Sequence, residues 1–278
     1  MNRPPGLAAR MEDRLREGSA HTLELARDVL GLSGHPGAAS AAVFALLGDD
    51  ARFRVDAGGM WSLDATAAGT PLTDLSYAVV DVETTGGGVH KGHRITEIAI
   101  VTVEAGQVID DWTTLVNPGR SIQPVVTAIT GITPEMVDAA PFFEHVAPEV
   151  SSRLEGRIFV AHNVGFDRGF VRKELVEAAG EAPAFTSLCT VQLARLLLPE
   201  LKRRNLDSLS RHLDVKIEGR HRAWGDARAT ARILLQLLER AEIQGIRDLD
   251  SLRKRLRGRR GRRRSGRRGS RRGPTEDN

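Results

Sequence analysis

The sequence predicts an α/β domain in which helices flank a mixed sheet, with a small α+β module before it and a basic tail after it. Residues 77–116 hold one apolar run and two alternating, β-branched stretches, which indicate neighbouring strands. Helical stretches then alternate with a short strand, as in α/β folds. The segment after 257 is rich in arginine and glycine and has no apolar residues to bury.

The first 64 residues are predicted to form a flexible start over 1–18 and a separate module over 19–64. Two helical patterns cover 21–30 and 38–47, and alternating stretches around an Asp-Ala-Gly-Gly turn follow at 52–63. Helices followed by a two-stranded wing indicate a winged-helix-like module, and a cap packed on the main domain is an equal alternative. The second helix has no Lys or Arg, which argues against strong phosphate contact, so docking to a polymerase or repair protein, or an autoregulatory role, fits at least as well as DNA contact.

An Ala-, Thr-, Gly- and Pro-rich linker is expected over 65–75, and the main domain over 76–257. Apolar runs and alternation predict its strands, which are 77–82, 94–104, 107–116 and 157–161. Helical periodicity predicts its helices, which are 144–154, 167–179, 187–198, 206–213, 225–240 and 246–257.

The charge is distributed unevenly along the chain. Residues 253–273 contain 13 Lys or Arg and no acid, and the tail over 258–278 is expected to be disordered. Outside 253–278, 27 basic and 34 acidic residues leave a net charge of −7. The tail is therefore expected to bind polyanions without sequence preference, whereas the body is mildly acidic.

Several protein classes are excluded by composition. No stretch reaches the roughly 18 apolar residues that a membrane span needs, so no membrane association is expected. The start of the chain lacks the pattern of a secretory signal. The single Cys189 allows neither an internal disulfide nor a cysteine-built zinc site, and a reducing, cytoplasmic location is expected.

The first motif with chemical content is Asp-Val-Glu-Thr-Thr-Gly at 81–86. Asp81 and Glu83 stand two residues apart at the end of an apolar strand, so their side chains point to the same face. Neighbouring carboxylates are costly unless a cation neutralises them, and a divalent metal is the natural partner. A solvated acidic turn is the alternative interpretation.

Two further motifs each place an acid at the start of a helix. Asp167 ends His-Asn-Val-Gly-Phe-Asp at 162–167, after the short strand, and Asp226 lies in His-Arg-Ala-Trp-Gly-Asp-Ala at 221–227. Each Asp could simply cap its helix, and Asn163 could be a turn residue. His221 alone would usually be a surface histidine.

Taken together, the three motifs resemble the His-containing branch of the DEDD exonuclease superfamily, and most of all the DNA polymerase III epsilon-subunit type of 3′–5′ exonuclease. Flanking stretches at 95–99, 130–136 and 188–199 also resemble that family. The resemblance covers roughly 75–240 and implies a ribonuclease H-like fold. A third glycine and the loop at 88–93 depart from it. We interpret that loop as a solvated turn, with contact to phosphates as the alternative.

The resemblance also implies the cofactors and the role of each residue. Asp81, Glu83, Asp167 and Asp226 would hold two divalent cations, Mg²⁺ or Mn²⁺. His221 would be the general base, because imidazole exchanges protons near neutral pH. The residues expected to line the pocket for the terminal nucleotide are Thr84, Thr85, His162, Asn163 and Ile132.

The expected function is therefore metal-dependent 3′–5′ hydrolysis that releases nucleoside monophosphates from single-stranded or frayed 3′ ends, of DNA rather than RNA. Two alternatives stay open at this point. One is an RNA-trimming exonuclease, because the sequence does not reveal whether the pocket accepts a 2′-hydroxyl. The other is a nucleic-acid-binding adaptor that uses the same fold as a scaffold, although the intact acids weigh against it.

Overall fold

The computed structural model describes residues 6–48, 50, 53–56, 58–63, 70–183 and 185–257. The described residues fall into two compact units. The first lies within 1–68, with 185–186 counted to it, and the second is the remainder. The expected disordered tail over 258–278 and residues 65–69 of the expected linker lie outside the described residues. Among the described residues, no helix combines the length and the apolar character that crossing a membrane requires.

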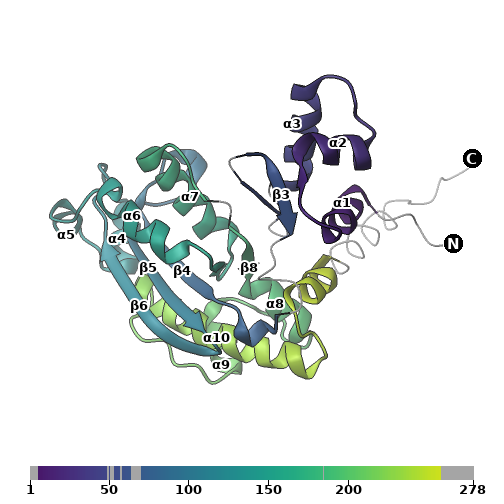
Figure 1. Ribbon diagram of the computed structural model, residues 1–278. Coiled ribbons are helices and arrows are strands. Elements are labelled where there is room, and N and C mark those ends of the chain that lie inside the picture. The colour runs from purple at the N-terminus through teal and green to yellow at the C-terminus, as the bar shows by residue number, and fades with distance from the viewer. Residues whose placement is uncertain are drawn as a thin grey trace, which may run out of the picture. The chain divides into compact units, whose positions relative to one another are not determined.

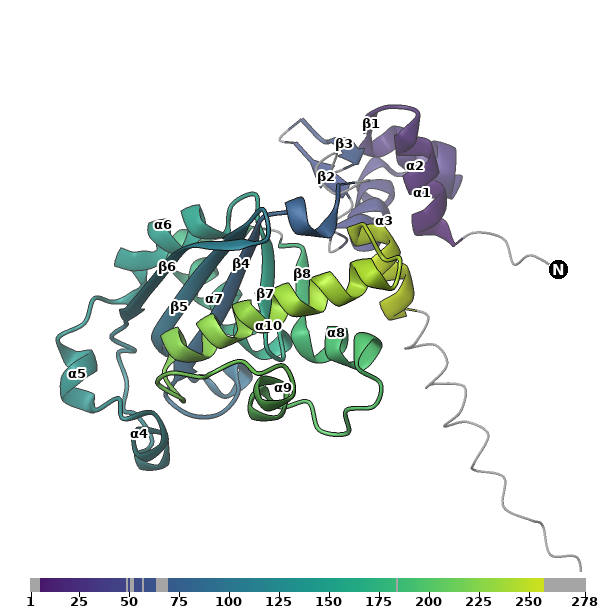
Figure 2. The ribbon, with the colours of Figure 1, turned by 90° about the horizontal axis from the view of Figure 1, so that it is seen from below.

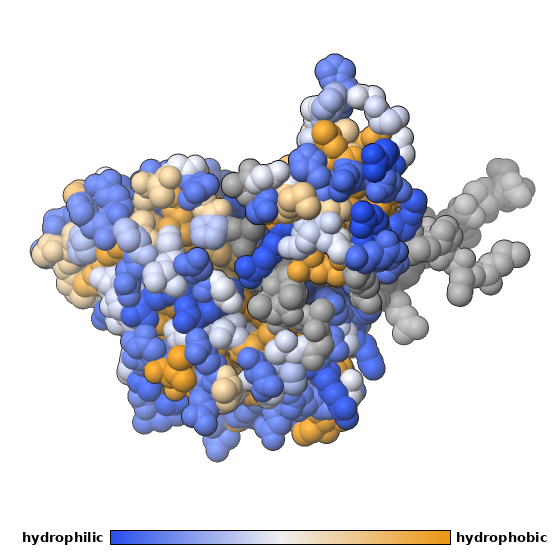
Figure 3. Space-filling view, viewed as in Figure 1, coloured by the Kyte–Doolittle hydropathy of each residue, from blue (hydrophilic) through white to orange (hydrophobic). Residues whose placement is uncertain are grey.

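The first unit is a small α+β module with a three-stranded antiparallel sheet in the order β1-β3-β2. Its elements are α1 (Leu7–Arg16), β1 (Ala20–His21), α2 (Thr22–Leu30), α3 (Pro36–Leu47), β2 (Phe53–Val55) and β3 (Met60–Leu63). Its core includes Leu25, Val43 and Trp61, and the Trp61 indole donates to Thr22 Oγ1 at 3.0 Å. On the face shown in Figure 3, apolar surface is scattered among polar residues in this unit.

The flexible start that we expected over 1–18 is wrong for residues 7–16. They form helix α1, and Met11 and Leu15 of this helix are buried in the core of the first unit. Two apolar residues four apart lie on one helix face, and this short signal is easily overlooked in a polar segment.

The second unit contains the mixed sheet that the sequence predicts, in the order β6-β5-β4-β7-β8 (Figure 1). Strands β4, β5 and β6 are antiparallel, whereas β7 and β8 run parallel to β4. The strands are β4 (Tyr77–Thr84), β5 (Ile95–Glu104), β6 (Gln107–Leu115), β7 (Ile158–Ala161) and β8 (Ser187–Cys189). Most residues of β4 and β5 are buried, as expected for central strands covered on both faces.

Helices cover both faces of this sheet. Helix α10 packs along β4, β5 and β6 on one face, and α6 and α7 lie on the other (Figure 2). The helices are α4 (Pro124–Thr130), α5 (Pro134–Asp138), α6 (Phe143–Leu154), α7 (Gly165–Ala179), α8 (Thr190–Leu197), α9 (Leu206–His212) and α10 (Ala223–Ile243). Two 3₁₀ turns cover Leu72–Asp74 and Val89–Lys91, and a further helix covers 249–257.

Two parts of the second unit differ from expectation. The segment expected to be helical from 187 starts as strand β8, which pairs with β7, and becomes helical only at Thr190. Three residues are too few to show a period of two, so tertiary pairing decides this strand. Helices α4 and α5 were not expected. Each has proline at its first position and is at most seven residues long.

Candidate functional site

Three predicted carboxylates meet beside the end of β4. Asp81 and Glu83 lie on this strand with their side chains on one face, and Asp226 lies in the first turn of α10. One carboxylate oxygen from each lies within 4.8 Å of the others. A register shift at Glu83/Thr84 interrupts the pairing of β4 with β5 at this point, as bulges often do beside functional sites.

Asp167 lies next to these three acids and has a different contact. It is buried in the first turn of α7, and its Oδ1 accepts a hydrogen bond from Val82 N at 3.2 Å. The pairing of β7 with β4 ends before Val82, so this carboxylate takes the place of a strand partner. The structure thus brings three of the four predicted carboxylates into one group, which we call the acid cluster (Asp81, Glu83, Asp226), with Asp167 at its side.

Burial and mutual repulsion keep the acids from ionising easily. Burial raises the pKa of Asp81 well above its usual range, and the charges of Asp167 and Asp226 add to this. Burial likewise raises the pKa of Glu83 to about 8, with contributions from Asp226 and Glu97. The pKa of Asp226 is also raised by burial, but Arg220 and the backbone of His221 oppose the shift. Such a group of acids favours an added positive charge.

The acid cluster fits a divalent cation by its donor set. Its ligand atoms are carboxylate oxygens, the type that Mg²⁺ and Mn²⁺ prefer. Asp226 Oδ1 is buried and, within the described part of the chain, has no hydrogen-bond partner. An unpaired buried carboxylate oxygen is costly unless a cation or a donor completes it.

His221 lies in the loop before α10, with its side chain exposed. Its backbone has φ of +64°, a left-handed conformation that is unfavourable for a residue with a side chain. Its backbone N–H donates to Asp226 Oδ2 at 3.2 Å. Gly225 allows the loop to cross the helix here, since a Cβ at this position would lie 1.7 Å from Glu218 O. The loop is thereby fixed against the first turn of α10.

Glu97 anchors the start of α10 from strand β5. It is 3% exposed, lies opposite Glu83 in the sheet, and accepts hydrogen bonds from the Arg222 guanidinium at 2.6–3.1 Å and from Ala223 N at 2.8 Å. Negative charge at a helix N-terminus is favourable. Glu97 lies in the flanking stretch 95–99 but was not predicted as a site residue, although an acid in the interior of an apolar strand is a usable signal.

The hydroxyl groups of the two threonines of the first motif form hydrogen bonds with other groups of the protein. Thr84 Oγ1 donates to Gly86 O at 3.0 Å. Thr85 is fully buried, lies 3.0 Å from His93 Nδ1 and accepts Arg94 N at 3.2 Å. His93 is therefore buried, whereas the rest of the loop at 88–92 is largely exposed. These contacts shape the loop that follows the acid cluster.

The other residues expected to line the nucleotide pocket differ in how deeply they are buried. His162 is half-buried, its Nδ1 lies 2.9 Å from Thr190 Oγ1, and burial lowers its pKa to about 4, so the ring is neutral at pH 7. Asn163 is exposed in a turn with φ of +73°. Ile132 has no exposed surface and packs in a small cluster with Ile122 and Val137.

Comparison with known proteins places the chain in a family. The family model RNase_T, described as Exonuclease, matches residues 78–234. The chain is 41% identical over 164 residues to the 3′–5′ exonuclease DinG of Bacillus subtilis (strain 168). This match covers 59% of this chain and 18% of that protein. It is 35% identical over 189 residues to DNA polymerase III subunit epsilon of Aquifex aeolicus (strain VF5), covering 68% of this chain and 93% of that one.

A third relative is the PolC-type DNA polymerase III of Clostridium perfringens (strain 13 / Type A), which is 37% identical over 174 residues. The match covers 60% of this chain and 12% of that polymerase, so the chain spans less than a fifth of the length of the DinG and PolC relatives. Among solved structures, E. coli Exonuclease I in complex with a dT13 oligonucleotide matches with a TM-score of 0.53 and 18% identity, over 62% of this chain and 42% of that one. The cell-death related nuclease 4 (CRN-4) matches with a TM-score of 0.52 and 17% identity, over 60% and 64%. At these identities the two structures indicate a shared fold.

Proposed function

The chain belongs to the RNase T exonuclease family and carries a 3′–5′ exonuclease domain, and on this premise we propose that the protein releases nucleoside monophosphates from DNA 3′ ends by metal-dependent hydrolysis. The acid cluster carries the proposal. Three carboxylates within 4.8 Å, with Asp226 Oδ1 buried and unpaired among the described residues, need a cation to be stable as anions.

Asp81, Glu83 and Asp226 would hold divalent cations, with Asp167 completing the set, and the family resemblance implies two ions, Mg²⁺ or Mn²⁺. When bound, such cations supply positive charge at the attacking water and at the leaving 3′-oxygen of a phosphodiester. Of the four acids, Asp81 is central, because Asp167, Asp226 and Glu83 all contribute to its raised pKa.

His221 acts as the general base and accepts a proton from the attacking water on its imidazole. Its exposure supports this role, since a base must reach solvent or substrate. Its left-handed backbone, held by Asp226 Oδ2, fixes where the side chain leaves the loop. The strain is an observed outlier next to the acid cluster, where functional strain is often found.

Support for DNA as the substrate comes from the relatives. The epsilon subunit is matched over 93% of its length, and Exonuclease I holds an oligonucleotide of deoxythymidines in its solved structure. The backbone around Thr84 and Thr85, together with His162 and Asn163, would contact the terminal nucleotide. His162 would do so as a neutral hydrogen-bonding group, because its pKa of about 4 removes the positive charge at neutral pH.

The test uses the full chain with Mg²⁺ or Mn²⁺ on matched DNA and RNA, single-stranded and duplex. A DNA strand labelled at its 5′ end should shorten in single-nucleotide steps, and a strand labelled at its 3′ end should release a labelled mononucleotide first. Asp81→Asn should lose activity by orders of magnitude, which excludes a contaminating nuclease. If RNA is hydrolysed faster than DNA, RNA is the preferred substrate and the proposal for DNA is wrong. If neither is hydrolysed although the protein binds metal, the adaptor function is favoured.

We further propose that residues 19–64, with helix α1 packed into their core, form a winged-helix-like module, separate from an exonuclease domain over 76–257. The order of helices and strands in the first unit supports this. Helix α3 has no Lys or Arg, which supports contact with a polymerase or repair protein rather than with phosphates. Deleting 1–64 should therefore leave the hydrolysis of a short oligonucleotide intact, which a kcat measurement on the truncated chain checks.

A further inference from the structure

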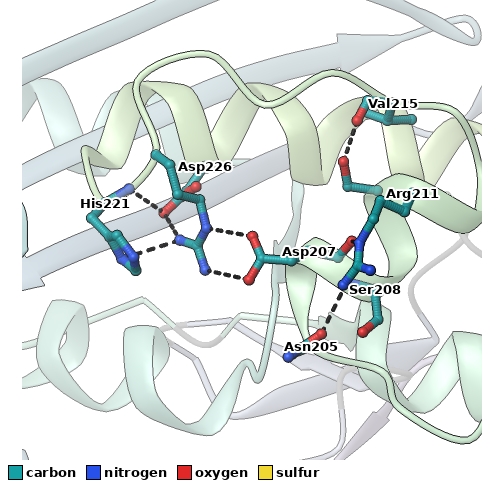
Figure 4. A network of polar contacts seen from close by, with 9 residues as sticks. Asn205, Asp207, Ser208, Arg211, Val215, His221 and Asp226 are labelled. Atoms are coloured by element: carbon teal, nitrogen blue, oxygen red, sulfur yellow. Dashed lines mark hydrogen bonds and ion pairs between the residues drawn. The ribbon is translucent and has the colours of Figure 1, made fainter.

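Arg220 bridges two carboxylates that come from different helices. Its Nε donates to Asp207 Oδ1 at 2.8 Å, and its Nη1 donates to Asp226 Oδ2 at 2.5 Å. Figure 4 shows the carboxylates of Asp207 and Asp226 on opposite sides of the guanidinium that joins them. A planar guanidinium offers donors on both edges, so one side chain can hold two acids in a fixed relation.

Asp207 provides the outer anchor of this bridge. It lies in the first turn of α9, which Asn205 caps by accepting Ser208 N at 2.9 Å. Its side chain is 47% exposed and is not part of the acid cluster. Asp207 can therefore be changed without burying an unpaired group. Its position on a capped helix gives the guanidinium a rigid support.

The two oxygens of Asp226 have different surroundings. Oδ2 accepts hydrogen bonds from Arg220 and from His221 N, whereas Oδ1 is buried and has no partner among the described residues. Arg220 thus fixes the rotation of a carboxylate that would otherwise be held by one backbone N–H. Partners of this kind, which orient a metal ligand, commonly change metal affinity by about 10- to 100-fold when they are removed.

We propose that Arg220 is a positioning residue which, anchored on Asp207, holds Asp226 by Oδ2 so that Oδ1 is presented to a divalent cation. The inference rests on the proposed function, because it assumes that Asp226 is a cation ligand. Arg220 also brings a positive charge close to the acid cluster, and this charge by itself opposes cation binding. The two effects are separated by a substitution that keeps the charge and removes the planar fork.

The test is a calorimetric titration of the metal-free full chain with Mn²⁺, without nucleic acid. Arg220→Lys keeps the charge, but an ammonium group cannot reproduce the two-sided bridge, and Mn²⁺ binding should weaken about 10-fold or more. Asp207→Asn removes the charge of the anchor and replaces one of its two acceptor oxygens by a donor amide, at an exposed site that should not affect folding, and should weaken Mn²⁺ binding at least about threefold. Arg157→Lys is the matched control. Arg157 holds Glu104 through Nε and Nη2 just before the start of β7, whereas the acid cluster lies beyond the other end of that strand, so this substitution should leave Mn²⁺ binding unchanged.

A second readout separates positioning from general damage. If Arg220 positions a metal ligand, raising the Mn²⁺ concentration should restore the kcat of Arg220→Lys toward the wild-type value on a short oligonucleotide. Mn²⁺ affinity within twofold of wild type in both Arg220→Lys and Asp207→Asn would overturn the proposal, and so would tighter binding in Arg220→Lys. Wild-type protein that binds Mn²⁺ but hydrolyses no nucleic acid would overturn the proposed function and leave this inference standing.

Discussion

Glu97 and Glu174 form nearly identical ion pairs, and only the first lies at the start of α10. Glu97 is 3% exposed and is bonded by the Arg222 guanidinium and Ala223 N. Glu174 on α7 is 2% exposed and is bonded by the Arg94 guanidinium at 2.5–2.8 Å and by Ile95 N at 3.2 Å. Replacing each by Gln therefore removes the same interaction at two places.

The loss of stability follows from what each substitution leaves behind. Removing one partner of a buried ion pair costs about 3–5 kcal/mol, because the other charge is left uncompensated. The partner arginines are 38% and 32% exposed, so water solvates them in part and the lower end applies. We expect a loss of about 3 kcal/mol for each variant. For a domain of this size that corresponds to roughly 6–12 °C in melting temperature.

Metal binding and catalytic rate should differ between Glu97→Gln and Glu174→Gln, although their losses of stability are similar. Ala223 is the first residue of α10, three positions before Asp226, and Arg222 is adjacent to His221. Glu97→Gln should therefore weaken Mn²⁺ binding and lower kcat, each about 10-fold or more, whereas Glu174→Gln should change both by less than threefold. Thermal unfolding of the metal-free proteins, Mn²⁺ titration and initial rates on a short DNA strand measure these differences.

The reasoning would be refuted by equal functional losses in both variants, because the effect would then come from stability alone. It would also be refuted if Glu97→Gln kept wild-type stability, because the ion pair would then contribute nothing. Measurements at 15 °C, far below the range of about 45–65 °C in which domains commonly unfold, ensure that reduced rates do not come from unfolded protein.

Three further outcomes are expected. Gly225→Ala should cost about 1–3 kcal/mol and most of the activity, because its Cβ would overlap Glu218 O, while Gly37→Ala in α3, with nothing within 4 Å, should be neutral or stabilising in the same thermal scan. The pKa of Glu83 is raised from 4.5 to about 8 in the folded protein, so its contribution to stability is fully present below pH 4.5 and is lost as the pH rises to 8. In the presence of a chelator, the melting temperature of Glu83→Gln relative to that of wild type should therefore increase from pH 5 to pH 8. A difference between the two melting temperatures that does not change with pH would contradict this. Removing residues 258–278, with nine Arg, should raise KM at moderate salt and leave kcat on a short oligonucleotide unchanged, and a loss of kcat would show that the tail does more than attract nucleic acid.

Local patterns were sufficient for the long elements of the second unit. The apolar run of β4 and the alternation of β5 and β6 predicted three neighbouring strands within two residues of their ends. Strand β8 and helix α1 were not predicted, because three residues show no period and because two buried residues do not stand out in a polar helix. Short elements depend on partners that are distant in the sequence.

The acids of the site were predicted from their motifs, but their relations to one another were not. Sequence spacing placed Asp81 and Glu83 on one strand face, and the resemblance added Asp167, Asp226 and His221. Only the structure separated Asp167, bonded to Val82 N, from the three acids that share a site.

The sequence by itself determined which residue types lie at the ends of which elements, because apolar periodicity and helix starts are local properties of the chain. The tertiary structure decided which acids have a partner. Glu97 is 125 positions from Arg222, and Asp207 is 13 positions from Arg220, so neither pair leaves a local signal. The register of β4 against β5 and the packing of α10 on the sheet bring these charges together. Burial then makes each pairing energetically important, and likewise the lack of a partner for Asp226 Oδ1 within the part of the chain that the structure describes.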